Sequence, residues 1–374
     1  MKRALLITLE FPPANGGVQR YLYEICGHLP KSQITVVTPF GEAYIGNNIN
    51  TLQVKFYSRF FWPRWLPLVN TLRRMYALGR FDTLLVGEVL PLGMVAKILY
   101  AFWGVPYAVF TYGMDITLPR LSFRKTALLK RILATADKIF TISSYTKDKI
   151  MELNVPDSKI DFIHPVVELK SLPRINQGNI DAVKNRYIPQ GKPVILTVAR
   201  LVPRKGHAVV VHAMKQVLKR FPNAVYVIVG DGPEQENIKK IAANEGVSSS
   251  VVMTGEVDDL TLHCLYESCD VFALTPTNDV DEHDIEGFGI VYLEAQAHRK
   301  PVIASRSGGA DEGAGGTGCA TIVEQNNSGA LAQAITNLLA DPDESRALGE
   351  RGFIRVSTMT WKNEIAPLVN LLAE

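Results

Sequence analysis

Residues 194–206 read VILTVARLVPRKG, and this stretch shows the pattern that decides the fold. An uninterrupted run of β-branched and aliphatic residues ends at Ala199, and such a run is typical of a strand inside a parallel sheet. Of the basic residues that follow the run, we single out Arg200 at its end and Lys205, which lies just before Gly206 and a helical stretch. The stretch therefore predicts a strand, a turn and a helix, with two cations at the carboxyl end of the strand.

The same alternation of short apolar runs and helical stretches occurs in two series, one on each side of a polar stretch. We therefore expect an α/β protein with two doubly wound, Rossmann-like domains that face a central cleft. A length of 374 residues suits two domains. The expected division is an N-terminal domain at 1–168, a linker at 169–190, a C-terminal domain at 191–358, and a helix at 359–374 that packs back across the domains. The expected strands are residues 4–9, 34–38, 83–86, 107–110 and 138–142, then 194–199, 225–229, 251–254, 271–274, 302–304 and 320–323.

The composition is that of a globular protein, with 47% apolar and 21% charged residues. The four cysteines form neither a CxxC pair nor a cluster with His at metal-ligand spacing, so they indicate neither a disulfide scaffold nor a zinc site. No apolar run approaches the roughly 20 residues of a membrane span. These features favour a protein of the reducing cytoplasm, and we expect no cofactor.

Basic charge is concentrated in the first part of the chain. Residues 1–168 hold 20 of the 40 lysines and arginines but only 12 of the 37 aspartates and glutamates. Two segments, 56–65 and 120–131, interleave basic residues with aromatic or aliphatic ones, which suits an anionic membrane surface. The alternative is an amphipathic helix whose aromatic stripe is buried and whose arginines are solvated. A nucleic-acid partner is a weaker interpretation, because no recognised motif accompanies the charge.

Glycines and cations gather at the carboxyl ends of the predicted strands. Paired glycines let backbone amides approach a phosphate or sugar closely, and fixed cations stabilise the charge that develops on a departing nucleoside diphosphate. Ordinary tight turns and surface charges are the alternative interpretation. The candidates are Gly16 and Gly17 after the first strand, Arg200 and Lys205, Gly230, Asp231 and Gly232, and Val257 after the next strand.

Residues 286–294, EGFGIVYLE, place two carboxylates eight positions apart around a glycine that precedes a helix. If the helix begins near Phe288 or Gly289, the amides of residues 288–290, including Ile290, can bind an anion. Glu286 and Glu294 can then accept hydrogen bonds from two diols, one of a sugar and one of a ribose. An ordinary solvated helix with acidic residues is the alternative. Asp279 and Asp281 resemble a metal-binding Asp-x-Asp, but we attribute the pattern to chance in an acidic loop.

In order along the chain, these residues and Ser307-Gly308-Gly309 resemble the motifs of family 4 of the retaining glycosyltransferases, which have the GT-B architecture. The resemblance covers nearly the whole chain. Residues 11–19 and 284–295 look most like the phosphatidylinositol mannosyltransferase branch. The resemblance implies an enzyme that transfers a hexose from a nucleotide diphosphate sugar to a hydroxyl of a glycan or lipid-linked acceptor, without a metal. Mannose from GDP-mannose is the favoured donor sugar.

The resemblance also implies roles for individual residues. Where many members carry histidine, this chain has Tyr112 in Tyr112-Gly113-Met114-Asp115, so the role of the imidazole does not carry over to Tyr112. Tyrosine can still donate a hydrogen bond to a sugar hydroxyl, and we expect Tyr112 and Asp115 to contact the acceptor. Because no residue stands out as a nucleophile, we expect substitution on one face of the sugar, with the β-phosphate oxygen of the leaving group taking the acceptor's proton. The implied donor contacts are Arg200 and Lys205 with the diphosphate, Glu294 with the ribose, Glu286 with the transferred sugar, and the amides near residues 288–290 with sugar or phosphate.

Other functions fit the same pattern. A transferase that uses a UDP-sugar, with glucose or N-acetylglucosamine, differs in the base that the site accepts. A nucleotide-sugar epimerase can have the same architecture and would need no acceptor. A binding protein built on an inactive transferase is a further alternative, which the presence of both glutamates and both cations argues against.

Overall fold

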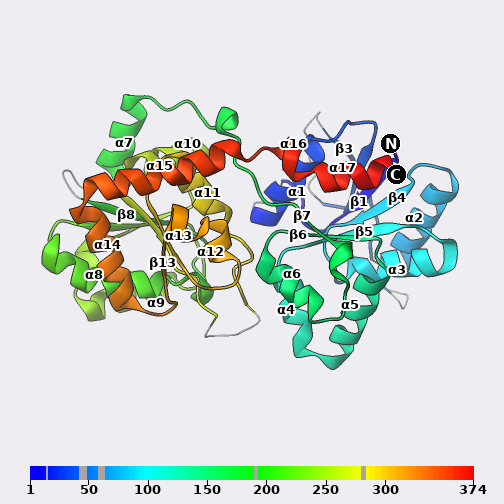
Figure 1. The fold of residues 1–374 in the computed structure, drawn as a ribbon, viewed down its shortest axis with the longest axis horizontal. Helices are drawn as coiled ribbons and strands as arrows, with labels where there is room; N and C mark the ends of the chain where they lie inside the picture. The colour runs from blue at the N-terminus through cyan, green and yellow to red at the C-terminus, as the bar shows by residue number, and fades with distance from the viewer. Residues whose placement is uncertain (14–15, 42–48, 58–63, 189–192, 279–283) are drawn as a thin grey trace. The chain divides into compact units, whose positions relative to one another are not determined.

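The computed structural model describes residues 1–13, 16–41, 49–57, 64–188, 193–278 and 284–374. These residues form two compact units. Unit 1 comprises Met1–Pro165 and Trp361–Glu374, and unit 2 comprises Val166–Thr360. Each unit is built on one parallel sheet with helices on both faces (Figure 1). The α/β class with two doubly wound parallel sheets, expected from the sequence, is therefore confirmed.

Unit 1 has a seven-stranded parallel sheet in the order β3-β2-β1-β4-β5-β6-β7. Every residue of the two central strands β1 and β4 is buried, because helices cover both faces. Helices α2, α3, α5 and α6 lie on one side of the sheet, and α1, α16 and α17 lie on the other (Figure 1). The elements are β1 Ala4–Ile7, α1 Gly17–Gly27, β2 Ile34–Pro39, β3 Asn50–Val54, α2 Leu66–Ala77, β4 Thr83–Val86, α3 Leu92–Trp103, β5 Tyr107–Thr111, α4 Met114–Thr117, η1 Leu118–Leu121, α5 Phe123–Thr135, β6 Lys138–Thr141, α6 Ser144–Met151, η2 Asp157–Lys159, β7 Ile160–Phe162, α16 Trp361–Glu364 and α17 Ala366–Ala373.

Unit 2 has a six-stranded parallel sheet in the order β10-β9-β8-β11-β12-β13. Helices α8, α9 and α14 form a core with one face, and α7, α10 and α11 form a core with the other (Figure 1). The elements are η3 Leu169–Ser171, α7 Gln177–Tyr187, β8 Val194–Val198, η4 Pro203–Lys205, α8 His207–Arg220, β9 Val225–Val229, α9 Gln235–Glu245, η5 Ser248–Ser250, β10 Val251–Gly255, α10 Asp259–Ser268, β11 Val271–Leu274, α11 Ile290–Ala297, β12 Val302–Ser305, α12 Ala310–Gly313, α13 Gly316–Cys319, β13 Thr321–Val323, α14 Ser328–Ala340 and α15 Pro342–Thr358.

The strand order fixes where a ligand site is expected in each unit. In both sheets the order reverses once, between β1 and β4 in unit 1 and between β8 and β11 in unit 2. Segments that leave two adjacent strands in opposite directions open a crevice at the carboxyl edge of such a sheet, and ligands bind there. The loops after β1, β4, β8 and β11 are therefore the segments in which to look for function.

Among the described residues, strands β3 and β7 and helix α7 lie outside the strands and helices that the sequence predicts. Strand β3 carries only exposed and half-buried residues, and β7 has three residues, so neither shows an apolar run. Helix α7 lies within residues 169–190, the stretch expected to be a linker, and Val183 is its one buried residue. Edge strands and a nearly solvated helix need little apolar surface, so their sequences resemble those of loops.

The C-terminal segment packs inside unit 1. Trp361 is only 2% exposed, and its ring stacks on His28 and lies against Tyr21. The carboxylate of Glu364 accepts a hydrogen bond from the backbone N–H of His164 at 2.9 Å. These contacts join the end of the chain to the helices and the last strand of unit 1. Within the described part of the chain, no helix is both long and apolar enough to span a membrane.

Candidate active site

A buried cluster of charge forms where β8 and β11 end. The turn η4 after β8 carries Arg204 and Lys205, and the segment after β11 carries Glu286. Arg204 Nη1 lies 3.1 Å from Glu286 Oε2, and Lys205 Nζ donates to the same oxygen. Arg204 Nε also lies 2.8 Å from Asp284 Oδ1. Because Arg204 and Glu286 are almost fully buried, this ion cluster is shielded from water.

The cations keep Glu286 ionised. Burial alone would raise its pKa, but Lys205 and Arg204 outweigh that effect and hold the pKa below the usual value. Both cations contact Oε2, and among the described residues no group donates a hydrogen bond to Oε1. Oε1 is therefore available to accept a hydrogen bond from a ligand hydroxyl.

Arg200 lies beside this cluster at the end of β8. Its side chain is exposed and makes neither a hydrogen bond nor an ion pair with the described residues. Burial lowers the pKa of Lys205, and the charge of Arg200 acts in the same direction. Arg204 and Lys205 thus share one carboxylate, and Arg200 adds its charge beside Lys205, which is a favourable place for the two negative charges of a diphosphate.

Two glycines allow the segments around Glu286 to approach. Gly206 has φ +71°, and a β-carbon there would lie 1.9 Å from the carbonyl oxygen of Thr275. Gly308 has φ +58°, and its β-carbon would lie 2.3 Å from the carbonyl oxygen of Glu286. The N–H of Gly309 donates to that same carbonyl at 2.9 Å. The glycines therefore fix the backbone positions of Lys205 and Glu286.

Glu294 is held on helix α11, which begins at Ile290 with Gly289 as its N-cap at φ +87°. This agrees with the helix start that the sequence predicts near Phe288 or Gly289. Glu294 is 4% exposed, and its Oε2 accepts a hydrogen bond from Tyr266 Oη at 2.9 Å. The Tyr266 ring in turn stacks on His298 with the ring planes 11° apart. The second carboxylate is therefore also fixed in place.

The predicted glycine turn after β9 packs against the segment that carries Arg200. Gly230 has φ +129°, and a β-carbon there would lie 2.2 Å from a backbone carbonyl oxygen. The carbonyl of Asp231 accepts a hydrogen bond from the N–H of Leu201 at 2.9 Å, and Gly232 closes the same turn. Val257, after β10, is half-buried beside the core. These residues line the carboxyl edge of the sheet next to the charged cluster.

In unit 1, Gly16 and Gly17 form the start of helix α1, with Gly16 as its N-cap. Gln19 in the first turn donates to Glu10 after β1. A β-carbon on Gly16 would lie 2.2 Å from the side-chain oxygen of Gln19, so a larger residue would displace that side chain. Gly16 therefore leaves room for the Gln19 side chain to reach Glu10 at the start of the helix.

Tyr112 and Asp115 lie together after β5. Asp115 Oδ1 accepts a hydrogen bond from the N–H of Tyr112 at 2.8 Å, and burial raises the pKa of Asp115 to about 6. The Tyr112 ring meets Tyr21 of α1 edge to face, with ring centroids 5.9 Å apart. Within the described part of the chain, neither the Tyr112 hydroxyl nor Asp115 Oδ2 has a hydrogen-bond partner, although both atoms are buried.

Sequence reasoning missed Glu88 and Arg204. Glu88 follows β4, and its two oxygens accept hydrogen bonds from Thr8 Oγ1 at 2.6 Å and from the N–H of Leu9 at 3.1 Å. Burial raises its pKa to about 7. Their positions in the sequence could have pointed to them, because Glu88 comes two residues after a predicted strand and Arg204 adjoins Lys205. Neither position shows in which direction the side chain points.

Some predicted features lie elsewhere. The structure does not describe the acidic residues and the histidine of the loop after β11, which are Asp279, Asp281 and His283, or residues 58–63 of the first basic segment.

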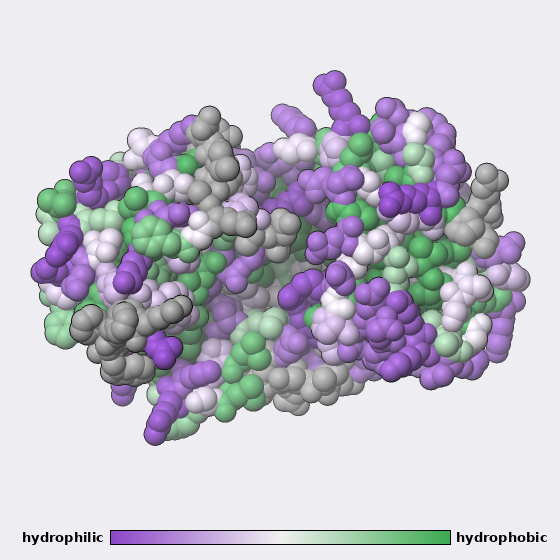
Figure 2. All heavy atoms as spheres, turned by 180° about the vertical axis from the view of Figure 1, so that it is seen from behind, coloured by the Kyte–Doolittle hydropathy of each residue, from purple (hydrophilic) through white to green (hydrophobic). Residues whose placement is uncertain are grey.

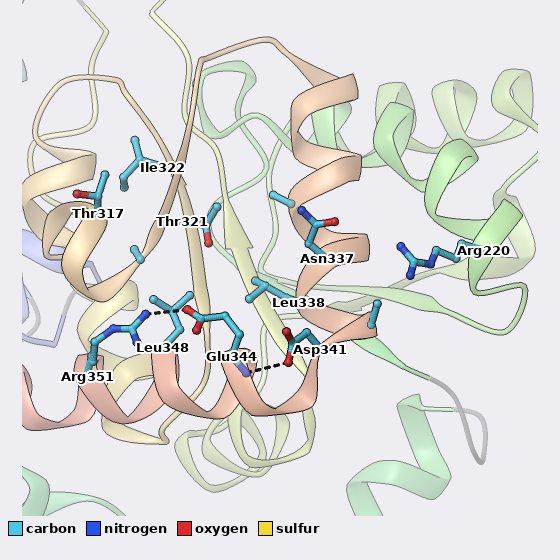
Figure 3. A pocket seen from close by; sticks show the side chains of 13 residues that line it. Arg220, Thr317, Thr321, Ile322, Asn337, Leu338, Asp341, Glu344, Leu348 and Arg351 are labelled. Carbon is cyan, nitrogen blue, oxygen red and sulfur yellow. Dashed lines mark hydrogen bonds and ion pairs between the residues drawn. The ribbon is translucent and has the colours of Figure 1, made fainter.

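A cavity of about 670 Å³ lies at the amino end of β13, between α14 and α15, away from the carboxyl edge that carries Glu286 (Figure 3). There Arg351 pairs with Glu344 at 2.9 Å, and Asp341 accepts from the backbone of Glu344, so these groups of the cavity wall bind one another.

Comparison with known proteins identifies the class. Residues 180–355 match the family Glycosyl transferases group 1, and residues 15–171 match Glycosyltransferase Family 4. The structure superposes on Anabaena HepE in complex with UDP and glucose with a TM-score of 0.82, at 18% identity and 100% coverage of both chains. It superposes on WaaG, a glycosyltransferase involved in lipopolysaccharide biosynthesis, with a TM-score of 0.73 at 15% identity, covering 99% of both chains. The fold is therefore that of a GT-B glycosyltransferase.

Curated relatives extend over the full length. The chain is 30% identical over 382 residues to the GDP-mannose-dependent alpha-(1-6)-phosphatidylinositol monomannoside mannosyltransferase of Mycobacterium tuberculosis, covering 100% of this chain and 98% of the relative. It is 28% identical over 380 residues to a monoacylated phosphatidylinositol monomannoside mannosyltransferase of Corynebacterium glutamicum, covering 99% and 98%. The chain belongs to glycosyltransferase family 4, and it is a glycosyltransferase.

Proposed function

We propose that this enzyme transfers mannose from GDP-mannose to a hydroxyl of a glycolipid acceptor of the phosphatidylinositol mannoside type, with retention of configuration. The observation that carries the proposal is the buried cluster of Arg204, Lys205 and Glu286 at the strand reversal of unit 2. The full-length relatives that are named as GDP-mannose-dependent enzymes support the choice of donor.

Each donor group has a partner in this arrangement. Arg200 and Lys205 bind the diphosphate and stabilise the charge on the leaving oxygen. When the diphosphate engages Lys205, Glu286 still has Arg204 as its ion-pair partner, and its Oε1 accepts from a mannose hydroxyl. Glu294, held by Tyr266, accepts from the ribose. The β-phosphate oxygen takes the acceptor's proton, so bond breaking and bond making occur on one face without a metal.

The test is a donor and acceptor screen. Purified enzyme is incubated with GDP-mannose, UDP-glucose or UDP-N-acetylglucosamine, with and without phosphatidylinositol monomannoside. The products are analysed by mass spectrometry, and the anomeric configuration by NMR. We expect α-linked mannose on the acceptor from GDP-mannose alone. A response only to UDP-sugars would replace the donor, and conversion of the donor to an isomer without acceptor would indicate an epimerase.

We also propose that unit 1 rests on the cytoplasmic surface of an anionic membrane, where a lipid acceptor would lie. Large apolar side chains are exposed on its helical surface, including Phe123 at 90%, Phe102 at 74% and Leu121 at 63%. Figure 2 shows hydrophobic residues interrupting the hydrophilic surface of this unit. Arg120, Arg124 and Lys125 adjoin Phe123 in sequence, and basic residues beside exposed rings bind anionic lipids.

Vesicle co-sedimentation tests the membrane contact. We expect Phe123→Ser to reduce binding to vesicles that contain anionic lipid, and 0.5 M salt to reduce it further. Ile354→Ser, which alters an exposed residue of unit 2, is the matched control. Equal binding of both variants would contradict the placement of the membrane surface.

A further inference from the structure

We infer that His298 is a positioning residue for the donor: it orients Tyr266, and Tyr266 holds the Glu294 carboxylate toward the ribose. Two neighbours of His298, Glu267 and His263, fix its ring in turn. Together these residues set how strongly the enzyme distinguishes a ribose from a sugar ring without hydroxyls. The inference deepens the proposed function and rests on it for the role of Glu294.

The link from Tyr266 to Glu294 is a direct hydrogen bond between two buried side chains. Tyr266 Oη donates to Glu294 Oε2 at 2.9 Å. A phenol has one proton to donate, so this bond holds one carboxylate oxygen at a defined place. The position of the Tyr266 ring therefore decides where the carboxylate is presented to a ligand.

The ring of His298 holds the ring of Tyr266. The two rings stack, with their planes 11° apart and their centroids 5.6 Å apart. Phe272 of β11 also contacts the Tyr266 ring, at 5.8 Å between centroids. His298 is the C-cap of α11, four residues after Glu294, so the two residues lie one turn apart on the same side of the helix. A change at His298 is therefore transmitted to Glu294 through Tyr266.

Two residues of α10 determine the orientation of the His298 ring. Glu267 Oε2 lies 2.9 Å from His298 Nδ1, and His263 Nδ1 lies 2.8 Å from His298 Nε2. The hydrogen bond with His298 is the largest of the effects that hold the pKa of Glu267 below its usual value. An ionised carboxylate only accepts, so Nδ1 of His298 carries a proton. In the neutral ring Nε2 then accepts, and His263 Nδ1 donates. Both ring nitrogens are engaged, so the ring cannot turn without breaking one of these bonds.

The spacing of residues on α10 brings these contacts together. His263, Tyr266 and Glu267 are three and four residues apart, so they lie on one face of the helix. His298 meets all three, and its side chain is only 7% exposed. One substitution at His298 therefore removes the ring stack and both hydrogen bonds at once.

The test measures nucleotide binding with and without the ribose hydroxyls. GDP and 2′,3′-dideoxy-GDP are titrated calorimetrically into the wild type, His298→Ala, Tyr266→Phe and the control His212→Ala. His212 is the matched control because it also pairs with a glutamate, Glu245, at 3.0 Å, but on an exposed part of α8. We expect the wild type and the control to bind GDP about tenfold or more tightly than the analogue, which lacks the hydroxyls that donate to a charged acceptor.

The two variants should lose this preference. We expect the affinity of His298→Ala and Tyr266→Phe for GDP to fall by about tenfold or more, and their affinity for the analogue to stay within about twofold of wild type. In steady-state kinetics KM for GDP-mannose should rise with kcat nearly unchanged, because the ribose contact is the same in the ground state and the transition state. Tyr266→Phe keeps the stacked ring, so it tests the link even if His298→Ala does not fold.

The outcomes separate this inference from the proposed function. Variants that keep the wild-type preference for GDP, or that lose affinity for both nucleotides equally, would overturn the inference. Glu294→Gln shows separately whether Glu294 binds the ribose. If it loses the preference while His298→Ala and Tyr266→Phe keep it, the ribose contact stands and the inference fails. If the wild type binds UDP in place of GDP, the proposed donor is wrong, and the same comparison with UDP and 2′,3′-dideoxy-UDP still decides the role of His298.

Discussion

Glu286 is a buried carboxylate, and one of its oxygens forms ion pairs with two cations. Removal of one member of such a cluster leaves an uncompensated charge, so each member affects the others. The residue therefore acts within a group that also includes Lys205 and Arg204. The sequence motif shows Glu286 but not the two cations that bind it, so the motif alone does not reveal this coupling.

Lys205→Ala removes a cation that we assign to the diphosphate. We expect turnover to fall by about 100-fold or more, the scale of losing one preorganised donor. Steady-state kinetics with saturating donor measures the effect. Lys239→Ala, on an exposed helix surface, is the matched control and should retain full activity. Near-wild-type turnover of Lys205→Ala would remove it from the catalytic group.

Glu88 should make stability depend on pH. Burial raises its folded-state pKa to about 7, so the folded protein holds the proton over a range where the unfolded chain has lost it. The stabilising contribution is present below the unfolded pKa and is lost as the pH rises through about 7. Between pH 5 and pH 8 the free energy of unfolding should fall in both proteins, and we expect the fall to be roughly 1 to 3 kcal/mol smaller in Glu88→Gln than in the wild type. Urea unfolding at the two pH values measures this, and parallel losses would show that Glu88 has an ordinary pKa.

At the scale of elements, the turn between β8 and α8 depends on a glycine. Gly206→Ala would place a β-carbon 1.9 Å from the Thr275 carbonyl oxygen, in addition to the strain of a positive φ. Gly246 has the same φ of +71°, but a β-carbon there meets nothing within 4 Å. Gly246→Ala should therefore cost about 1 kcal/mol, and Gly206→Ala more. Thermal unfolding and transfer rate test this, and only Gly206→Ala should also slow transfer.

Sequence patterns predicted the interior strands better than the edges. Strands such as β9 and β11 are buried along their whole length, so their apolar runs mark them in the sequence. Strand β3 has no buried residue and helix α7 has one, so the hydrogen bonds that define them are not accompanied by an apolar pattern in the sequence. The helix start at Ile290 was predictable because a glycine with positive φ and a following apolar run are both local signals.

At the scale of the molecule, the stability of unit 1 depends on the C-terminal segment of the chain, which packs inside this unit. Trp361 is almost fully buried against Tyr21 and His28. We expect Trp361→Ala to cost about 3 to 5 kcal/mol, as for other buried aromatic residues. Ile354→Ala, at an exposed position of unit 2, should cost far less. Urea unfolding followed by circular dichroism checks the difference, and similar losses would place Trp361 outside the core.

The sequence by itself determined the α/β class, the glycine turns, the run of motifs that marks family 4, and most strands, because each of these is encoded in neighbouring residues. The tertiary structure decided the pairings that make the sites. Arg204 meets Glu286 across 82 residues, and Thr8 meets Glu88 across 80. The physical reason is that a parallel sheet brings the carboxyl ends of distant strands to one edge. Which side chains meet there depends on strand order and backbone direction, and neither is written in a local pattern.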